Sequence, residues 1–286
     1  MNGTHDSRTS FKENRRKWEF SLISQAMLTY YPANIEPLPD IHRRPAILEF
    51  GSGPSSGAEF LHKMGKLTVS DIYRHPLLNL PEDVEFVISD IHNTQFSGES
   101  FDVLVSNQVL EHLERLDIAF KEMQRITKAN GHFFFSIPTA TWLVLTIPGQ
   151  LFKKVENVFN NIIRRNRKKK MIDNNENCSS IEATDKNTLN GDIKTTNKSL
   201  LGKFQIGGHG CYPNFFNCFG MFKINNWRNT LLSNGFEIIK ETPLLTYGSS
   251  HFPLIPTNRF LAKYGFPSSY LFVCKKQSVK SMIPIT

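Results

Sequence analysis

The stretch Ile47-Leu48-Glu49-Phe50-Gly51-Ser52-Gly53-Pro54-Ser55-Ser56-Gly57 decides the fold. Its apolar start predicts a buried strand, which breaks into a glycine turn and then a helix. Gly51 and Gly53 permit tight backbone geometry and let a ligand approach the main chain, and free amides at a helix start favour an anionic group. A purely structural turn and a dinucleotide-binding dehydrogenase stay open here, although Gly57 comes one place later than the dehydrogenase fingerprint requires.

Outward from this turn, short apolar runs alternate with helical ones, a pattern typical of a parallel sheet with crossover helices. We therefore expect an α/β fold, a doubly wound, Rossmann-like sheet of seven strands. The predicted strands are 46–50, 67–70, 85–89, 101–106, 132–137, 236–241 and 270–275. Predicted helices cover 56–64, 116–127 with a stop at Asn130-Gly131, and 224–233 with a stop at Asn234-Gly235.

Two segments fall outside this alternation. Residues 1–44 form an N-terminal extension whose aromatic helical part, 18–31, is expected to cap the ligand edge of the sheet. Residues 139–221 form a long insertion after the fifth strand, and connections of this length are usually functional or disordered. We expect it to contain an amphipathic helix, a basic run, a disordered stretch at 171–200 and a glycine-rich lid loop. The core domain is then 45–138 with 222–280.

Acidic residues follow the next two predicted strands. Asp71 ends the second strand, where a carboxylate can accept both hydroxyls of a ribose. Asp90 ends the third strand and is followed by Ile91, so that an acceptor for an adenine amino group stands beside an apolar side chain. The fourth strand then runs from Phe101 through Ser106-Asn107-Gln108 into Val109-Leu110-Glu111-His112-Leu113.

This ordered set of motifs resembles the class I S-adenosylmethionine-dependent methyltransferases, in the branch that acts mostly on small molecules. The resemblance covers about 40–140 and extends to 222–276, and it implies that the last strand is antiparallel. It implies that Gly51, Ser52 and Gly53 cradle the methionine part of S-adenosyl-L-methionine, with Glu49 near its ammonium. Asp71 would hold the ribose, Asp90 and Ile91 the adenine, and Ser106, Asn107 and Gln108 the methionine side facing the acceptor. Ser55 and Pro54 depart from the usual glycine turn.

Two histidines are the catalytic candidates. His112 follows the fourth strand, and an imidazole that titrates near neutral pH can serve as a general base. Orienting the loop or capping its helix is the structural alternative. His209 lies in Gly207-Gly208-His209-Gly210-Cys211-Tyr212-Pro213, a flexible stretch that could close over the acceptor like a lid or serve only as a linker. Cys211 and Cys218 are expected to be buried thiols, and no metal is expected.

Positive charge gathers in one place. The 286 residues carry a net charge of +8, of which +7 lies in 151–170. This segment has apolar residues at helical spacing and ends in a basic run, a combination typical of helices that lie on an anionic membrane surface. A cap helix packed on the active site, with a solvated basic tail, fits equally well. Single-stranded RNA fits less well, because the aromatic side chains do not alternate with the charges.

The composition indicates the class of protein and the cellular compartment. Hydrophobic residues make up 40% and charged residues 21%, as in ordinary globular proteins. The most apolar stretch, 133–148, is too short and polar to cross a bilayer, no secretion signal is expected, and four widely spaced cysteines fit a reducing compartment. We expect a cytoplasmic protein, peripheral to a membrane if the basic helix docks there.

The expected function is transfer of a methyl group to oxygen or nitrogen of a small or lipid-linked acceptor. DNA adenine methylation is disfavoured, because the fourth strand ends in Ser-Asn-Gln-Val. Two alternatives are an RNA methyltransferase that uses the basic insertion and a catalytically inactive protein that binds an adenosine ligand or a partner. Nucleic acid is the less favoured partner.

Overall fold

A computed structural model describes residues 3–31, 44–54, 57–176, 209–212, 214–249 and 257–277, with side chains of the two longest helices described only for 10–30 and 140–167. Within these residues seven strands form one sheet. They are β1 (Ala46–Phe50), β2 (Lys66–Asp71), β3 (Glu85–Ile88), β4 (Phe101–Asn107), β5 (Thr127–Pro138), β6 (Phe236–Pro243) and β7 (Ser269–Lys276). Each predicted strand is present, with ends that differ mostly by one or two residues.

The strand order is β3-β2-β1-β4-β5-β7-β6. The first five strands along the chain pair in parallel, and β7 runs antiparallel to both β5 and β6. The predicted doubly wound sheet with an antiparallel last strand is therefore confirmed. Because the order reverses between β1 and β4, the carboxyl ends of these two strands border the crevice in which such sheets bind ligands.

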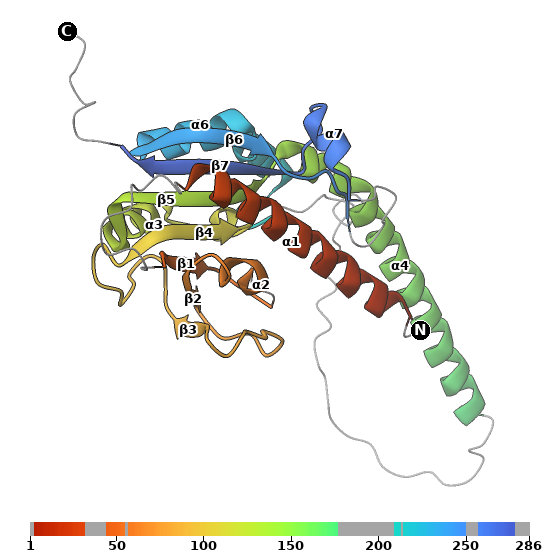
Figure 1. Ribbon diagram of the computed structural model, residues 1–286. Coiled ribbons are helices and arrows are strands. Elements are labelled where there is room, and N and C mark those ends of the chain that lie inside the picture. The colour runs from red at the N-terminus through yellow and green to blue at the C-terminus, as the bar shows by residue number, and fades with distance from the viewer. Residues whose placement is uncertain are drawn as a thin grey trace.

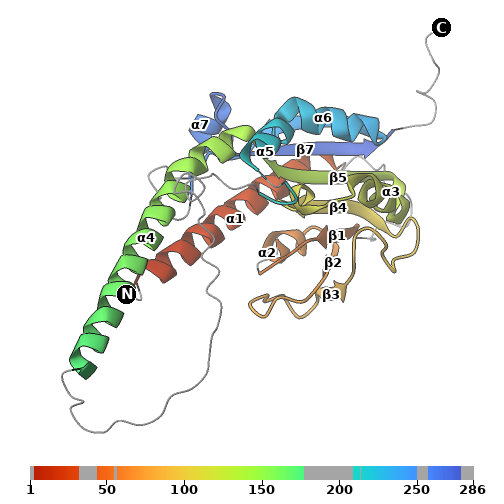
Figure 2. The ribbon, with the colours of Figure 1, turned by 180° about the vertical axis from the view of Figure 1, so that it is seen from behind.

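Apolar side chains cover both faces of the sheet. One core contains Phe120 and Met123 of α3 (Leu116–Ile126) and Trp227 of α6 (Ile224–Ser233). The other contains Ile23 of α1 (Gly3–Tyr30) and Leu61 of α2 (Ala58–Leu61). Figure 1 shows that α1 meets the sheet with its C-terminal part and that its N-terminal part extends away from it, and the reverse view shows α6 and α3 on the other side of the sheet (Figure 2). The C-terminal half of α1 therefore covers part of one face of the sheet, while its N-terminal half extends beyond the sheet.

Two predicted helix boundaries are wrong. The stop at Asn130-Gly131 comes too late, because α3 ends at Ile126 and Thr127 already pairs with Phe101 in the sheet. Gly131 lies inside β5, where an added Cβ would be 3.0 Å from the Asp102 carbonyl oxygen, so this glycine permits close strand approach. The helix expected at 56–64 is reduced to α2, four residues long; Ser55 and Ser56 lie outside the described residues. The predicted α6 and its Asn234-Gly235 stop are confirmed.

The insertion starts as one helix, α4 (Ala140–Glu176), with Pro148 inside it. It takes in the predicted amphipathic helix and basic run and extends well beyond the sheet, as both ribbon views show (Figures 1 and 2). Disorder predicted from residue 171 is wrong for 171–176, which continue the helix; 177–200, and Gly207, Gly208 and Pro213 of the lid loop, lie outside the described residues. No helix in the described part of the chain is long and apolar enough to cross a membrane.

The remaining helices are short and surround the carboxyl edge of the sheet. The 3-10 turn η1 (Leu110–His112) follows β4 directly, α5 (Phe215–Met221) leads into α6, and α7 (Arg259–Lys263) precedes β7. Asn214 caps α5 by accepting the Asn217 amide at 2.9 Å. These turns place the residues that follow β4 and those that follow the insertion against each other.

Candidate functional site

The glycine turn after β1 has the backbone conformation that only glycine adopts readily. Gly51 and Gly53 have φ of +72° and +56°, in the left-handed region. The Gly51 amide donates to the Ser70 carbonyl at 2.8 Å. A Cβ on Gly51 would lie 2.5 Å from Cγ2 of Val109, so the segment after β4 packs directly on this turn.

Two acidic side chains accept hydrogen bonds from backbone amides of this turn. The Asp71 carboxylate accepts the Gly53 amide at 2.8 Å and the Ile72 amide at 2.7 Å. Both oxygens of Glu49, which is 2% exposed, accept the Gly57 amide at 2.9 and 3.1 Å. Each carboxylate oxygen can accept more than one hydrogen bond. The structural contacts of Asp71 and Glu49 are therefore compatible with their predicted contacts to the cofactor.

Asp90 and Ile91 follow β3 at the same edge of the sheet. Asp90 is exposed and accepts the backbone amide of His92 at 2.9 Å. This hydrogen bond and a second one from the His92 ring together lower the pKa of Asp90 below its usual value. Ile91 is buried in the core beside β4. The adenine contacts assigned to these two residues stay predictions.

Three consecutive polar residues end β4. Ser106 is fully buried, and its Oγ has no hydrogen-bond partner among the described residues. Asn107 donates through Nδ2 to Glu19 of α1 at 3.4 Å. Gln108 has φ of +59° and donates through Nε2 to Ser136 Oγ at 3.1 Å. Of these three, Gln108 reaches the cavity described next.

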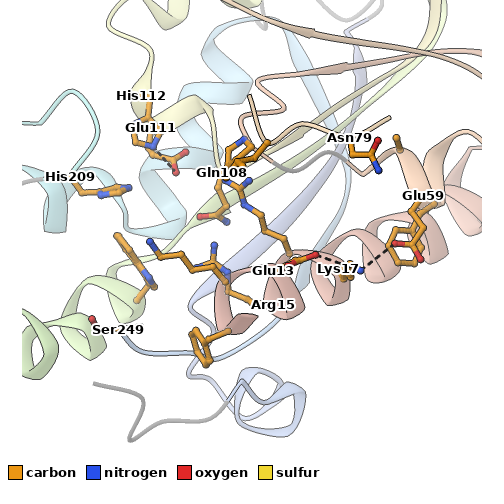
Figure 3. A pocket seen from close by; sticks show the side chains of 18 of the residues that line it. Glu13, Arg15, Lys17, Glu59, Asn79, Gln108, Glu111, His112, His209 and Ser249 are labelled. Atoms are coloured by element: carbon orange, nitrogen blue, oxygen red, sulfur yellow. Dashed lines mark ion pairs between the residues drawn. The ribbon is translucent and has the colours of Figure 1, made fainter. Parts of the chain in front are cut away.

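A cavity of about 1080 Å³ extends from the glycine turn to the end of β4 (Figure 3). Its walls come from α1, α2, the loop after β2, η1, α4 and the residues after β6. Pro54 and Ala58 line one part, while His112, His209 and Trp142 line another. The volume is in the range of small-molecule and cofactor sites. Gln108, His112 and His209 are the predicted site residues that line it.

The two predicted catalytic histidines meet at one end of this cavity, with Glu111 beside them. The ring centroids of His112 and His209 are 5.0 Å apart, and His112 Nε2 is 3.7 Å from Glu111 Oε1. Burial lowers the pKa of His112 and lowers that of His209 to about 4, while it raises the pKa of Glu111 to about 8. Both imidazoles are therefore neutral at pH 7 and can accept a proton.

Arg15, Arg16 and Glu19 of α1 lie at the site, although no sequence motif points to them. The Arg15 guanidinium lies 4.5 Å from the ring centre of Tyr247, and its Nε is 3.9 Å from Glu19. The Arg16 guanidinium lies 3.7 Å from where a Cβ of Gly53 would be. Charged residues usually mark a solvated helix face, so burial of these three becomes visible only once α1 is packed on the sheet.

The predicted cofactor fits these residues. Gly53 leaves its backbone free of a side chain on the side that faces Arg16, whose positive charge complements a carboxylate. Ser52 Oγ, Ser106 Oγ and Asn107 Oδ1 are buried without partners among the described residues, and such groups call for a ligand or water. The turn, the acids after β2 and β3 and these polar atoms can therefore hold S-adenosylmethionine.

Comparisons with known proteins point to a family for the central part of the chain. Residues 48–135 match the family model described as a methyltransferase domain. No curated protein sequence matches the chain.

Among solved structures, the chain is similar to a 1,6-didemethyltoxoflavin N1-methyltransferase of Burkholderia thailandensis, at 12% identity over 96% of this chain and 87% of that one, with a TM-score of 0.48. It is also similar to a putative methyltransferase of Haloferax volcanii in complex with the activator Trm112, at 11% identity over 95% and 93%, with a TM-score of 0.48. Residues 48–135 thus form a methyltransferase domain, and the sheet order and the glycine turn support its placement among the class I S-adenosylmethionine-dependent methyltransferases.

Proposed function

We propose that this enzyme methylates an oxygen or nitrogen atom of a small or lipid-linked acceptor while α4 lies on an anionic membrane surface that faces the cytoplasm. S-adenosylmethionine supplies an activated methyl group on a sulfonium when it is bound. The protein then has to align the acceptor with that methyl group and keep water out. The glycine turn, which reaches the cavity at Pro54, would hold the cofactor together with Asp71, and the two histidines line the other end of the cavity.

His112 is the base that this arrangement favours for an acceptor that must lose a proton. Its side chain is 49% exposed and lines the cavity, so an acceptor can reach it. His209 packs against Trp142 at a ring distance of 4.6 Å, and both side chains line that end of the cavity. The proton would leave through the exposed side of His112.

The observation that carries the membrane proposal is a stripe of exposed apolar side chains on α4. Val155, Val158, Phe159 and Ile162 are 57%, 46%, 63% and 50% exposed. Trp142, Thr146 and Gln150 of the same helix line the cavity. At 1.5 Å per residue, Phe159 lies about 14 Å along the helix from Gln150. The helix thus connects the cavity with an apolar surface.

The charge at the far end of this stripe favours an anionic lipid surface as its partner. Arg164, Arg165 and Arg167 are exposed, and Lys168-Lys169-Lys170 follow in the sequence. Each basic residue near an anionic bilayer contributes on the order of 1 kcal/mol to binding. An acceptor with a lipid tail could then stay in the bilayer while its head group enters the cavity. If α4 were instead a cap helix packed on the active site, the apolar side chains of the stripe would have to be covered by protein.

Vesicle flotation tests the proposal. At low salt the full chain should float with vesicles that contain phosphatidylserine, and flotation should weaken as salt rises, because the Debye length shortens from about 30 Å at 0.01 M to about 8 Å at 0.15 M. Replacing Arg164, Arg165 and Arg167 by Gln should weaken vesicle binding at least tenfold. The double change Phe159→Ser and Ile162→Ser should weaken it further, since it removes apolar surface from the stripe.

A matched control lies on the opposite side of the same helix, where Asn157→Ser should leave flotation unchanged. Affinity for S-adenosylmethionine should be the same in all these variants. Failure of the wild type to float would contradict the membrane proposal. So would a loss of folding stability in the Phe159→Ser and Ile162→Ser variant, since that face would then be packed on protein. Retention on single-stranded RNA but not on vesicles would favour the RNA methyltransferase instead.

A further inference from the structure

We propose that Glu111, His112 and His209 bind a divalent transition-metal ion, such as Zn²⁺, which holds an oxygen atom of the acceptor. One potential ligand atom from each residue lies within 4.8 Å of the others. Figure 3 shows the three side chains converging at the same end of the cavity. We call these residues the glutamate–histidine cluster. The inference rests on the proposed methyl transfer but replaces the base role given to His112, because an imidazole that ligates an ion cannot also accept the acceptor's proton; the ion would instead lower the pKa of a bound hydroxyl. It needs no contact with a membrane.

Backbone contacts fix the cluster before any ion binds. Glu111 and His112 are neighbours in η1, immediately after β4. His209 comes from a distant segment that docks on Glu111, where the Cys211 amide donates to the Glu111 carbonyl at 3.2 Å. Gly210 has φ of +64°, and a Cβ there would collide with that same carbonyl oxygen. The chain therefore brings His209 to Glu111 by a contact that requires glycine.

A second observation points to a missing ligand. Glu111 is 1% exposed, and its Oε2 has no hydrogen-bond partner among the described residues. Its Oε1 is 3.7 Å from His112, which is beyond hydrogen-bond length. A buried carboxylate is costly unless it is paired, hydrogen-bonded or bound to a metal. Arg15 contributes favourable charge but donates no described hydrogen bond to Glu111.

The donor set indicates the class of ion. Two imidazole nitrogens and one carboxylate oxygen suit Zn²⁺ and its first-row neighbours, whereas Mg²⁺ and Ca²⁺ prefer all-oxygen sites. Three protein ligands leave at least one coordination position open, as in catalytic zinc sites. His112 is 49% exposed toward the cavity. An open position there suits an acceptor with a hydroxyl, carboxylate or phosphate oxygen, and an ion acidifies a hydroxyl that it binds.

Metal titration of the purified, chelator-treated full chain tests the inference. Calorimetry with Zn²⁺ should show one ion per chain, and Co²⁺ should give the visible absorption of a site with nitrogen and oxygen ligands. His112→Ala, His209→Ala and Glu111→Gln should each weaken the binding at least tenfold. His75→Ala, a histidine outside the cluster, is the matched control and should leave binding unchanged. Mg²⁺ should compete poorly.

Thermal unfolding of each variant guards against misfolding, because Glu111 is buried. Because His112 is half-exposed, the His112→Ala variant should fold, and its metal affinity then tests the site without interference from misfolding. No stoichiometric binding by the wild type, or binding unchanged in folded His112→Ala, would overturn the metal site. Vesicle flotation and cofactor calorimetry on the same samples separate the two proposals. Lost flotation with intact Zn²⁺ binding contradicts the membrane proposal alone, and the reverse pattern contradicts the metal site alone.

Discussion

Gly51, which follows β1, packs directly against Val109, which follows β4. We expect Gly51→Ala to lower the free energy of unfolding by about 2–4 kcal/mol, for two reasons. A side chain in the left-handed region costs roughly 1–2 kcal/mol, and the added Cβ would lie 2.5 Å from Val109 Cγ2, a collision that adds a similar amount. Urea denaturation measures the loss.

Gly235 provides the matched control for this prediction. Its φ is +79°, but an added Cβ would find nothing closer than 3.6 Å. Gly235→Ala should therefore show the conformational cost without the collision. Val109→Ala should cost less in the Gly51→Ala background than in the wild type. Equal losses for the two glycine variants would show that Val109 does not press on the turn.

At this scale the sequence predicts some residues well and others not at all. The glycines and Asp71 follow directly from a strand that ends in a turn, so local pattern suffices. The sequence does not reveal that Asp71 accepts the Gly53 amide, because that bond joins two different strand ends. His112 and His209 could each be suspected from their neighbours, but their meeting depends on how the insertion returns to the sheet.

Among the elements, α3 is fastened to the loop after β3 through Glu122. Its carboxylate accepts the Thr94 amide at 2.9 Å and bonds to Arg125 at 2.6 Å. The hydrogen bonds from Arg125 lower the pKa of Glu122 to about 2, against burial that raises it. A lowered folded-state pKa stabilises the protein above the ordinary value near 4.5, and this contribution disappears as the pH falls toward 2.

We therefore expect Glu122→Gln to destabilise the protein by about 1–2 kcal/mol at pH 7, as for the loss of hydrogen bonds to a charged group. The difference from the wild type should shrink steadily between pH 5 and pH 3. Denaturant unfolding at several pH values measures it. Asp117→Asn removes a carboxylate that is 51% exposed, at the start of the same helix, and its surface ion pair with Arg115 should contribute little. A pH-independent difference would mean that shape, and not charge, holds this loop.

The boundaries of helices and strands show where tertiary contacts override the local sequence pattern. Asn130-Gly131 is a reasonable helix stop, yet β5 begins at Thr127 because its pairing with β4 outweighs helix propensity. In α4 the helical spacing beyond residue 150 is easy to detect. Its start at Ala140 is hidden, because Pro148 normally marks a boundary.

At the scale of the molecule, α1 and α4 meet the sheet edge where the cavity lies (Figures 1 and 3). The alternation of strands and helices was sufficient to predict the sheet, since most of its strands are continuous apolar runs. It was not sufficient to place α1, because Arg15, Arg16 and Glu19 look like a solvated face until the helix is packed. The acceptor end of the cavity is hidden for the same reason: its residues come from segments far apart in the chain.

Binding of S-adenosylmethionine to the purified full chain, measured by calorimetry, tests the central claim most directly. The wild type should bind one molecule, and Asp71→Ala should weaken binding about 10- to 150-fold, since a charge-assisted hydrogen bond contributes about 1.5–3 kcal/mol. Asp117→Ala, which removes an exposed carboxylate away from the turn, should bind like the wild type. No binding by the wild type, or undiminished affinity in a folded Asp71→Ala variant, would contradict a cofactor site at the glycine turn.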